Sequence, residues 1–271
     1  MTNPPTRPEP FYRQVDAHRF DSLPATTGVW SPEHQHAGPP AALLVRAMEE
    51  HGQHEGMRLA DVRSDILGPV PVRPLDISVS TLRSGRSMEL LEASASADGR
   101  TVMTARAWRI RRAPEDYPPL SGWRDGEVPA VPEASGESRA VVLTGGHESG
   151  YQRSVEWRFV QGGPGSGGPA VAWGRQLNQL VEGEEPSPWQ RTLVLADSAG
   201  GISLAVDPRV HRFINCDLHV ALDRDMHGQW LRMSAQSLAT PGHGGIVHNA
   251  LADSRGELGY GLQAMVAQNM E

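Results

Sequence analysis

The sequence contains no lysine, and its 25 basic residues other than histidine are all arginine. This absence excludes mechanisms that form a Schiff base with an enzyme amine, such as those of pyridoxal phosphate enzymes, and it excludes the Walker lysine of nucleotide-binding loops. Cys216 is the only cysteine, so an internal disulfide and a zinc site of the CxxC type are excluded as well.

Long apolar runs are also missing. No run approaches the roughly 18 residues of a membrane-spanning helix, and the proline-rich start MTNPPTRPEP lacks the apolar segment of a secretory signal. With the single cysteine, these features predict a cytoplasmic protein with no membrane span. The formal net charge of −7, with no basic stretch beyond RIRR at 109–112, argues against nucleic acid as a partner.

A stretch rich in proline, glycine, serine and acidic residues, 113–150, divides the chain near its middle and indicates a linker. We therefore expect an N-terminal unit at 1–112 and a C-terminal unit at 151–271. The units end alike, in ADGRTVMTARAW at 97–108 and ADSRGELGYGLQ at 252–263, which suggests a duplication.

Each unit is predicted to place one apolar helix among long antiparallel strands. In the first unit the expected order is a helix at about 37–51 and strands at 60–70, 75–84, 88–97 and 101–111. In the second it is a hairpin at 154–161 and 170–178, a helix at 188–204, and strands at 211–223, 229–239, 245–252 and 257–267.

The first helix begins with the stretch HQHAGPPAALL at 34–44. Gly38 allows the close approach of another backbone, and proline is tolerated in a first turn because its nitrogen has no helical partner there. Free N–H groups at a helix start can also orient a carbonyl or a phosphate, which makes His36 and Gly38 candidate substrate-binding residues.

Four histidines in this region raise the question of a metal site: His34, His36, His51 and His54. The HxH spacing is not the i, i+4 spacing of a helical site, and no carboxylate or cysteine completes a recognisable ligand set. We therefore expect no metal.

Motifs typical of two other enzyme classes are either out of context or absent. Residues 163–168 match GxGxxG, but a strand pattern follows where a dinucleotide-binding fingerprint requires a helix, so we expect a flexible hairpin loop. No GxSxG nucleophile elbow occurs in the chain. No nicotinamide, flavin or other cofactor is expected.

The strand RFINCDLHVALDR at 212–224 alternates between apolar and polar residues. The alternation places one set of side chains on an apolar face: Ile214, Cys216, Leu218, Val220 and Leu222. The other set faces the opposite way: Asn215, Asp217 and His219. On this pattern Cys216 is a small core residue, and the polar face lies either in solvent or in a site.

Five segments carry a resemblance to a known family: HAGPPAALLVRAME, LRSGRSMELLEASASADGRTV, LADSAGGISL, FINCDLHVALDRDMHGQWL and DSRGELGYGLQ. They resemble bacterial acyl-CoA thioesterases of the double-hotdog type over residues 15–112 and 152–268. The resemblance implies an α+β fold in which two curved antiparallel sheets each wrap around a central helix. It also implies thioester hydrolysis between the two units and a homodimer or higher homo-oligomer.

The resemblance further implies a set of catalytic residues. Asp217 falls at the position of a catalytic aspartate, and Gln263 matches the glutamine of the last strand. A hydroxyl completes the family's site, and Thr240 or Ser237 could supply it. Asp217 would take a proton from the attacking water, while Gln263 and the hydroxyl would fix the water and donate hydrogen bonds to the developing oxyanion.

Two other functions fit the same fold. One is a hydratase or dehydratase acting on an acyl thioester, in which His34 or His36 would form half of an acid–base pair. The other is an acyl-thioester-binding protein without catalysis. Fold alone does not separate these from a thioesterase, and the sequence leaves the acyl group open.

Overall fold

The computed structural model describes residues 9–52, 55–118, 120, 130–132, 149–163 and 166–270. In the first half it has a 3-10 turn at Pro24–Thr26 and these elements: β1 (Tyr12–Gln14), β2 (Arg19–Ser22), α1 (Gly38–Glu50), β3 (Met57–Ile66), β4 (Leu75–Arg83), β5 (Met88–Ala97) and β6 (Arg100–Arg111). In the second half it has these: α2 (Gly150–Arg153), β7 (Val155–Gln161), β8 (Ala170–Gln176), α3 (Pro188–Ala196), α4 (Ala199–Ile202), β9 (His211–Asn215), β10 (Asp217–Leu222), β11 (Trp230–Thr240), β12 (Gly244–Asp253) and β13 (Gly256–Asn269).

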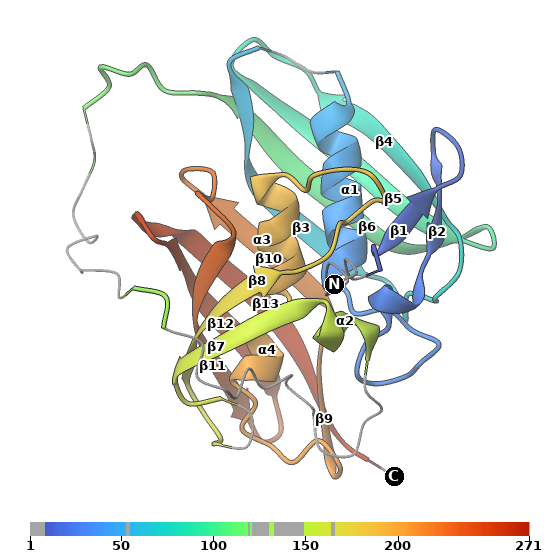
Figure 1. Ribbon diagram of the computed structural model, residues 1–271, viewed down its shortest axis with the longest axis vertical. Coiled ribbons are helices and arrows are strands. Elements are labelled where there is room, and N and C mark those ends of the chain that lie inside the picture. The colour runs from blue at the N-terminus through green and yellow to red at the C-terminus, as the bar shows by residue number, and fades with distance from the viewer. Residues whose placement is uncertain are drawn as a thin grey trace, which may run out of the picture.

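The described strands form one antiparallel sheet in the order β1-β2-β4-β5-β6-β3-β10-β13-β12-β11-β8-β7, with β9 paired to β13 beside this path. The halves meet where β3 pairs with β10, and at this seam Val62 lies opposite Val220, both fully buried. Figure 1 shows α1 lying against the strands of the first half and α3 among those of the second.

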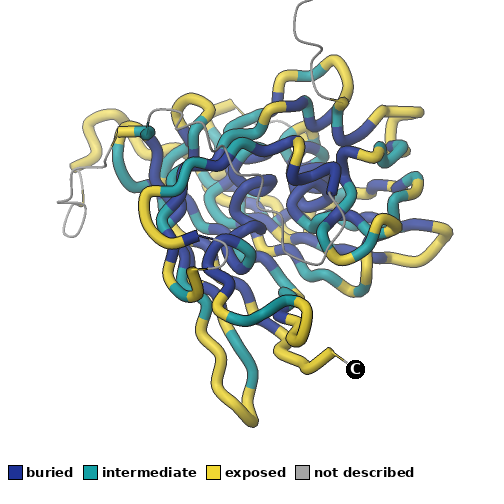
Figure 2. The backbone as a smooth tube through the Cα atoms, turned by 60° about the horizontal axis from the view of Figure 1, so that its bottom comes forward, coloured by how far each residue is buried: buried dark blue, intermediate teal, exposed yellow. Residues whose placement is uncertain are grey.

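The helix α1 confirms the prediction at 37–51 and is buried on almost every side, because strands and α3 surround it. Figure 2 shows the buried residues gathered along the helices and inner parts of the sheet, with exposed loops around them. Among the described residues, no helix has the length and apolar character that a membrane crossing requires.

The two long helices pack closely at their contact. A Cβ added to Gly38 at the start of α1 would lie 2.6 Å from the carbonyl oxygen of Val194 in α3, a distance that no side chain tolerates. The expected close backbone approach at Gly38 is therefore confirmed. Further along α1, Arg46 donates two hydrogen bonds, of 2.6 and 2.7 Å, to Glu184 in the segment before α3.

The predicted hairpin around the GxGxxG motif is confirmed, because β7 and β8 pair antiparallel on either side of it. Residues 164–165 of the motif lie outside the described residues, as does most of the expected linker at 113–150. The division into units at 1–112 and 151–271 stays a prediction. The short strands β1 and β2 were not expected from the sequence.

The prediction of one helix at 188–204 is wrong. The helix α3 ends at Ala196, and a separate short helix, α4, begins at Ala199. Asp197 and Ser198 lie between them, so a carboxylate stands where the helix is interrupted.

The prediction of one continuous strand at 211–223 is also wrong. Asn215 of β9 pairs with Met265, and His219 of β10 pairs with Leu262, so three residues on one strand face two on the other. This count defines a β-bulge, which bends a strand and changes the facing of the side chains beyond it. Phe213 and Leu218 are accordingly both buried, although five positions separate them.

We predict that the buried carboxylate of Asp253 stabilises the second half. Burial opposes its ionisation, but hydrogen bonds from Arg224 and from the backbone N–H groups of His227 and Arg255 outweigh this effect and lower the pKa of Asp253. Asp253→Asn should lower the free energy of unfolding at pH 7 by about 3–5 kcal/mol, the usual cost of breaking a buried ion pair. Urea unfolding measures the difference.

The pH dependence of this effect follows from the lowered pKa. The stabilisation is present above the unfolded-state value of about 4 and is lost as the pH falls through the folded-state pKa. The deficit of the variant should therefore shrink below about pH 4. Asp98, which pairs with Arg73 and is 70% exposed, supplies the control Asp98→Asn. An equal loss in both variants would contradict the role of Asp253.

Candidate active site

A cavity of about 610 Å³ lies where segments of both halves meet. Its wall is formed by residues from six segments: 28–37, 66–70, 151–157, 197–204, 212–216 and 263–270. Among the described residues, Asp197 is the only carboxylate that lines it, and Arg212 is the only arginine.

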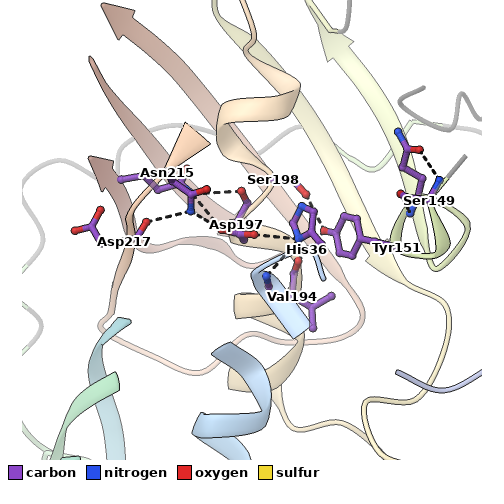
Figure 3. Close-up of polar contacts among 11 residues, drawn as sticks. His36, Ser149, Tyr151, Val194, Asp197, Ser198, Asn215 and Asp217 are labelled. Atoms are coloured by element: carbon purple, nitrogen blue, oxygen red, sulfur yellow. Dashed lines mark hydrogen bonds and ion pairs between the residues drawn. The ribbon is translucent and has the colours of Figure 1, made fainter. Parts of the chain in front are cut away.

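The side chain of Asp197 is 3% exposed and is contacted by polar groups from three elements. Its Oδ1 accepts hydrogen bonds from Asn215 Nδ2 at 2.8 Å and from Gln263 Nε2 at 3.3 Å. Its Oδ2 lies 3.0 Å from His36 Nδ1. Figure 3 shows Asn215 and His36 approaching the carboxylate from opposite sides.

The ring of His36 is fixed by stacking. It lies 3.6 Å from the ring of Tyr151, centroid to centroid, with an angle of 5° between the planes. The Tyr151 hydroxyl contacts the Val194 carbonyl and the Ser198 hydroxyl, both at 2.7 Å (Figure 3). Burial raises the pKa of Tyr151, so this hydroxyl remains protonated. Tyr151 thus provides a fixed, uncharged aromatic ring on which the imidazole stacks.

Two groups compete for His36 Nδ1. A proton on Nδ1 allows donation to Asp197 Oδ2 at 3.0 Å, whereas a lone pair there would accept from Gly38 N–H at 3.3 Å. The contact with the carboxylate is shorter and is strengthened by charge, so we assign the proton to Nδ1. His36 Nε2 is then the ring nitrogen left for a ligand.

Gln263, in β13, is 2% exposed and places its amide against Asp197. Its Nε2 lies 3.3 Å from both the backbone carbonyl and Oδ1 of that residue. Its Oε1 is buried and has no hydrogen-bond partner among the described residues. An unpaired buried carbonyl costs about 1–3 kcal/mol, and such groups are typical of sites that a ligand or water completes.

Asp217 lies within the bulge, two residues after Asn215. Its Oδ1 accepts the backbone N–H of Ala264 at 2.6 Å, and its Oδ2 lies 3.6 Å from Arg63 Nη2. Asp217 is not among the residues that line the cavity, and Figure 3 shows its carboxylate turned away from Asp197. The structure therefore brings Gln263 together with Asp197, and not with the carboxylate of Asp217.

The two candidate hydroxyls lie elsewhere as well. Thr240 is exposed at the end of β11, beside His243 and Gly244. Ser237 contacts the Ser203 hydroxyl at 2.8 Å, beyond the end of α4. Neither residue lines the cavity that contains Gln263.

The prediction that Cys216 is a core residue is wrong. The bulge leaves this thiol exposed, and it lines the cavity next to Asn215. The same bulge turns Asn215 inward, toward Asp197, although the simple alternation had grouped it with Asp217. Alternation fails here because one extra residue reverses the facing of everything beyond it.

His36 lines the cavity, as expected of a substrate-binding residue, but Gly38 does not. The N–H of Gly38 points at His36, and the next two residues are prolines without an N–H group. The N–H of Ala41 is bonded to Ala37. None of residues 38–41 lines the cavity, so this first turn presents no N–H group to it, and Gly38 serves the packing of the helices.

No group of three or more potential metal ligands occurs among the described residues. His34 and His36 line the cavity, whereas His51 contacts Thr81 at the other end of α1. His54 lies outside the described residues. The absence of a metal or other cofactor stays an expectation.

Comparison with known protein families decides the identity. Residues 26–110 match the acyl-CoA thioesterase N-terminal domain, and residues 114–266 match the acyl-CoA thioesterase C-terminal domain. The chain belongs to the acyl-CoA thioesterase family. The resemblance seen in the sequence is confirmed, and with it the expectation of a thioester hydrolase. A hydratase or dehydratase has no support. A comparison with curated proteins gives no match.

Solved structures show the fold of this thioesterase. A hot dog fold protein of Alicyclobacillus acidocaldarius has a TM-score of 0.70 at 15% identity, covering 95% of each chain. An acyl-CoA thioesterase II of Mycobacterium marinum has a TM-score of 0.63 at 16% identity, and the tesB protein of Mycobacterium avium subs paratuberculosis has 0.63 at 18%; each covers 96% of both chains. At these identities the likeness establishes a hotdog fold.

Sequence reasoning found Gln263 and His36 but missed the carboxylate between them. Asp197 stands in the segment LADSAGG, where an aspartate followed by a serine and two glycines interrupts an apolar helix pattern. Aspartate is a poor helix former and glycine a worse one, so this interruption was a usable signal. No comparable signal marks Asn215 or Tyr151, because their roles depend on the bulge and on the α2 segment.

We predict that Cys216 reacts in the native thioesterase. Because the thiol is exposed and lines the cavity, iodoacetamide should modify it without unfolding. A bound S-alkyl-CoA thioether, which cannot be hydrolysed, should slow the reaction. Mass spectrometry of the intact protein measures the modification, and Cys216→Ser is the unlabelled control. Labelling that requires denaturant would mean that the thiol is buried after all.

Proposed function

We propose that the enzyme hydrolyses acyl-CoA thioesters by direct attack of water and that Asp197 is the general base. The position of Asp197 carries this proposal: it is the only described carboxylate in the cavity wall, and its side chain is 3% exposed. A thioester carbonyl is electrophilic and its thiolate is a fair leaving group. A positioned water therefore needs a proton acceptor and an oxyanion donor, and no covalent intermediate.

The hydrogen bonds around Asp197 leave room for that water. An ionised carboxylate has about four lone-pair sites, and Asn215, Gln263 and His36 occupy three of them. Both hydrogens of Asn215 Nδ2 are used, one on Asp197 and one on the carbonyl of residue 217. Asn215 is thus a positioning residue that holds the base, and it takes the role for which the resemblance implied the hydroxyl of Thr240 or Ser237.

Gln263 is the proposed oxyanion donor. Its two hydrogen bonds to Asp197 are long, at 3.3 Å, so one N–H can turn to the thioester oxygen as charge develops there. Its unpaired Oε1 can accept a hydrogen from the attacking water. The proton that Asp197 takes from the water then passes to the departing CoA thiolate, which gives the free acid and CoA.

Asp197→Asn removes the proton acceptor and should lower the rate of CoA thiol release by about 10²–10⁴-fold. Gln263→Ala should cost about 2.7–4 kcal/mol of barrier if it supplies an oxyanion donor. Because both residues act on one water, the loss of rate in the double variant should be much smaller than the product of the two single losses. Thermal unfolding confirms that each variant is folded.

Asp217→Asn is the matched comparison. It changes a carboxylate at the start of β10 that points away from the cavity, so hydrolysis should stay near the parental rate. The reverse result, with Asp217→Asn inactive and Asp197→Asn active, would return the role of base to Asp217. Full activity of both variants would reject the site. Saturable binding of acyl-CoA without turnover by the parental protein would favour an acyl-binding protein.

We further propose a double hotdog, with units at 1–112 and 151–271 joined by a linker at 113–150. The burial of α1 among β3, β4, β5 and β6 supports the first unit, and the contacts of α3 with β8 and β11 support the second. A cytoplasmic location is proposed as well, on the strength of the single cysteine.

Assembly into a homodimer is supported by an apolar row on the outer side of β13. Four successive outward-facing side chains there are exposed and none is charged: Tyr260, Leu262, Ala264 and Val266. Ile246 of β12 pairs with Ala264, and Leu238 of β11 pairs with Ile246. Ile246 and Leu238 are each 45% exposed, so the apolar surface extends across β13, β12 and β11. Contiguous apolar surface of this kind is typical of interfaces.

We predict that Leu262→Arg disrupts this assembly. Light scattering should give the parental chain about twice its monomer mass of 29.4 kDa and give the variant the monomer mass. Leu82→Arg, at a similarly exposed position on β4, should leave the dimer intact. A parental monomer across micromolar concentrations would reject the dimer.

A further inference from the structure

The cavity wall contains two kinds of residue. Five apolar side chains in it are at most 8% exposed: Trp157, Ile202, Leu204, Phe213 and Met265. Other residues of the wall are exposed, among them Trp30, Arg212, Cys216 and Met270. CoA is anionic, and Arg212 is the one arginine of the wall among the described residues. The buried apolar part of the wall therefore suits the acyl group, and the exposed part suits CoA.

The short helix α4 contributes two glycines to the cavity wall, Gly200 and Gly201, which precede the buried Ile202. A Cβ at Gly201 would meet no atom within 4 Å, whereas one at Gly200 would lie 3.2 Å from the Met265 side chain. Neither glycine has a positive φ, so the backbone conformation does not require them. Glycine costs about 1 kcal/mol relative to alanine inside a helix, so these residues lower the stability of α4 while leaving space in the cavity.

We infer that Gly201 is a specificity-determining residue, which keeps the acyl end of the cavity open and so sets the longest acyl chain that the enzyme accepts. This inference rests on the proposed hydrolysis at Asp197. The acyl chain extends from the thioester past α4, along Phe213 and Met265. A side chain at position 201 fills the space that the distal methylenes of a long chain would occupy, and a short chain never reaches it.

The test is a series of substitutions, Gly201→Ala, Gly201→Val and Gly201→Leu, measured with acyl-CoAs from acetyl to palmitoyl. The kcat/KM for long chains should fall about fourfold for each methylene displaced, the equivalent of ~0.8 kcal/mol. The longest chain accepted should shorten as the side chain grows, while the shortest substrates keep the parental rate. An unchanged chain-length profile in Gly201→Leu, or an equal loss for all chain lengths, would overturn the inference.

Gly68→Leu is the matched control. Gly68 also lines the cavity, has no atom within 4 Å of an added Cβ and has no positive φ, but it precedes Pro69 in the loop after β3. Its effect on kcat/KM should not depend on acyl length. Thermal unfolding shows whether each variant is folded. Failure of the parental enzyme to release thiol from any acyl-CoA would refute the proposed function itself, whereas retained hydrolysis of short chains by Gly201→Leu isolates the question of length.

Discussion

The contact between α1 and α3 at Gly38 is the constraint on which the site depends. The backbone of α1 approaches the Val194 carbonyl so closely that any Cβ would collide with it. This approach sets His36, two residues before Gly38, beside Asp197, three residues after Val194. Neither half of the chain can build this pair alone, so the packing of the helices and the assembly of the site are one event.

The start of α1 shows how packing and chemistry share the same residues. A helix normally begins with free N–H groups, but here two prolines remove two of them and the Gly38 N–H faces His36. The end of the helix near Asp197 therefore presents an imidazole instead of a row of backbone donors. Asp197, the proposed base, receives one directed contact from His36, at 3.0 Å.

The sequence predicted the long elements well because their hydrophobic periods are regular. The helix at 37–51 and the strand at 88–97 appear in the structure as α1 and β5 with ends that agree to within one residue. The short strands β1 and β2 were not predicted, because three or four residues are too few to show an alternation of apolar and polar residues. The sequence pattern grouped Asn215 with Asp217 because periodicity assumes an unbroken ladder, and the bulge between Asn215 and His219 adds one residue to it. Asp217, which the resemblance identified, therefore points away from the cavity, whereas Asn215 lines it.

The two long helices differ in the charge at their C-terminal ends. At the end of α1, Arg109 donates to the carbonyls of His51 and Gly52 at 2.8 and 3.0 Å, which places a cation at the negative end of a helix, where it is stabilising. At the end of α3 the corresponding place is taken by Asp197, an anion that the helix dipole disfavours. Hydrogen bonds from Asn215 and Gln263 and the contact with His36 compensate this carboxylate, and they do so from three separate elements. A charge held against the local field in this way is consistent with the proposed role of Asp197 as general base. The end of α1 is thus stabilised by its local charge, whereas the end of α3 carries the carboxylate that we propose for the chemistry.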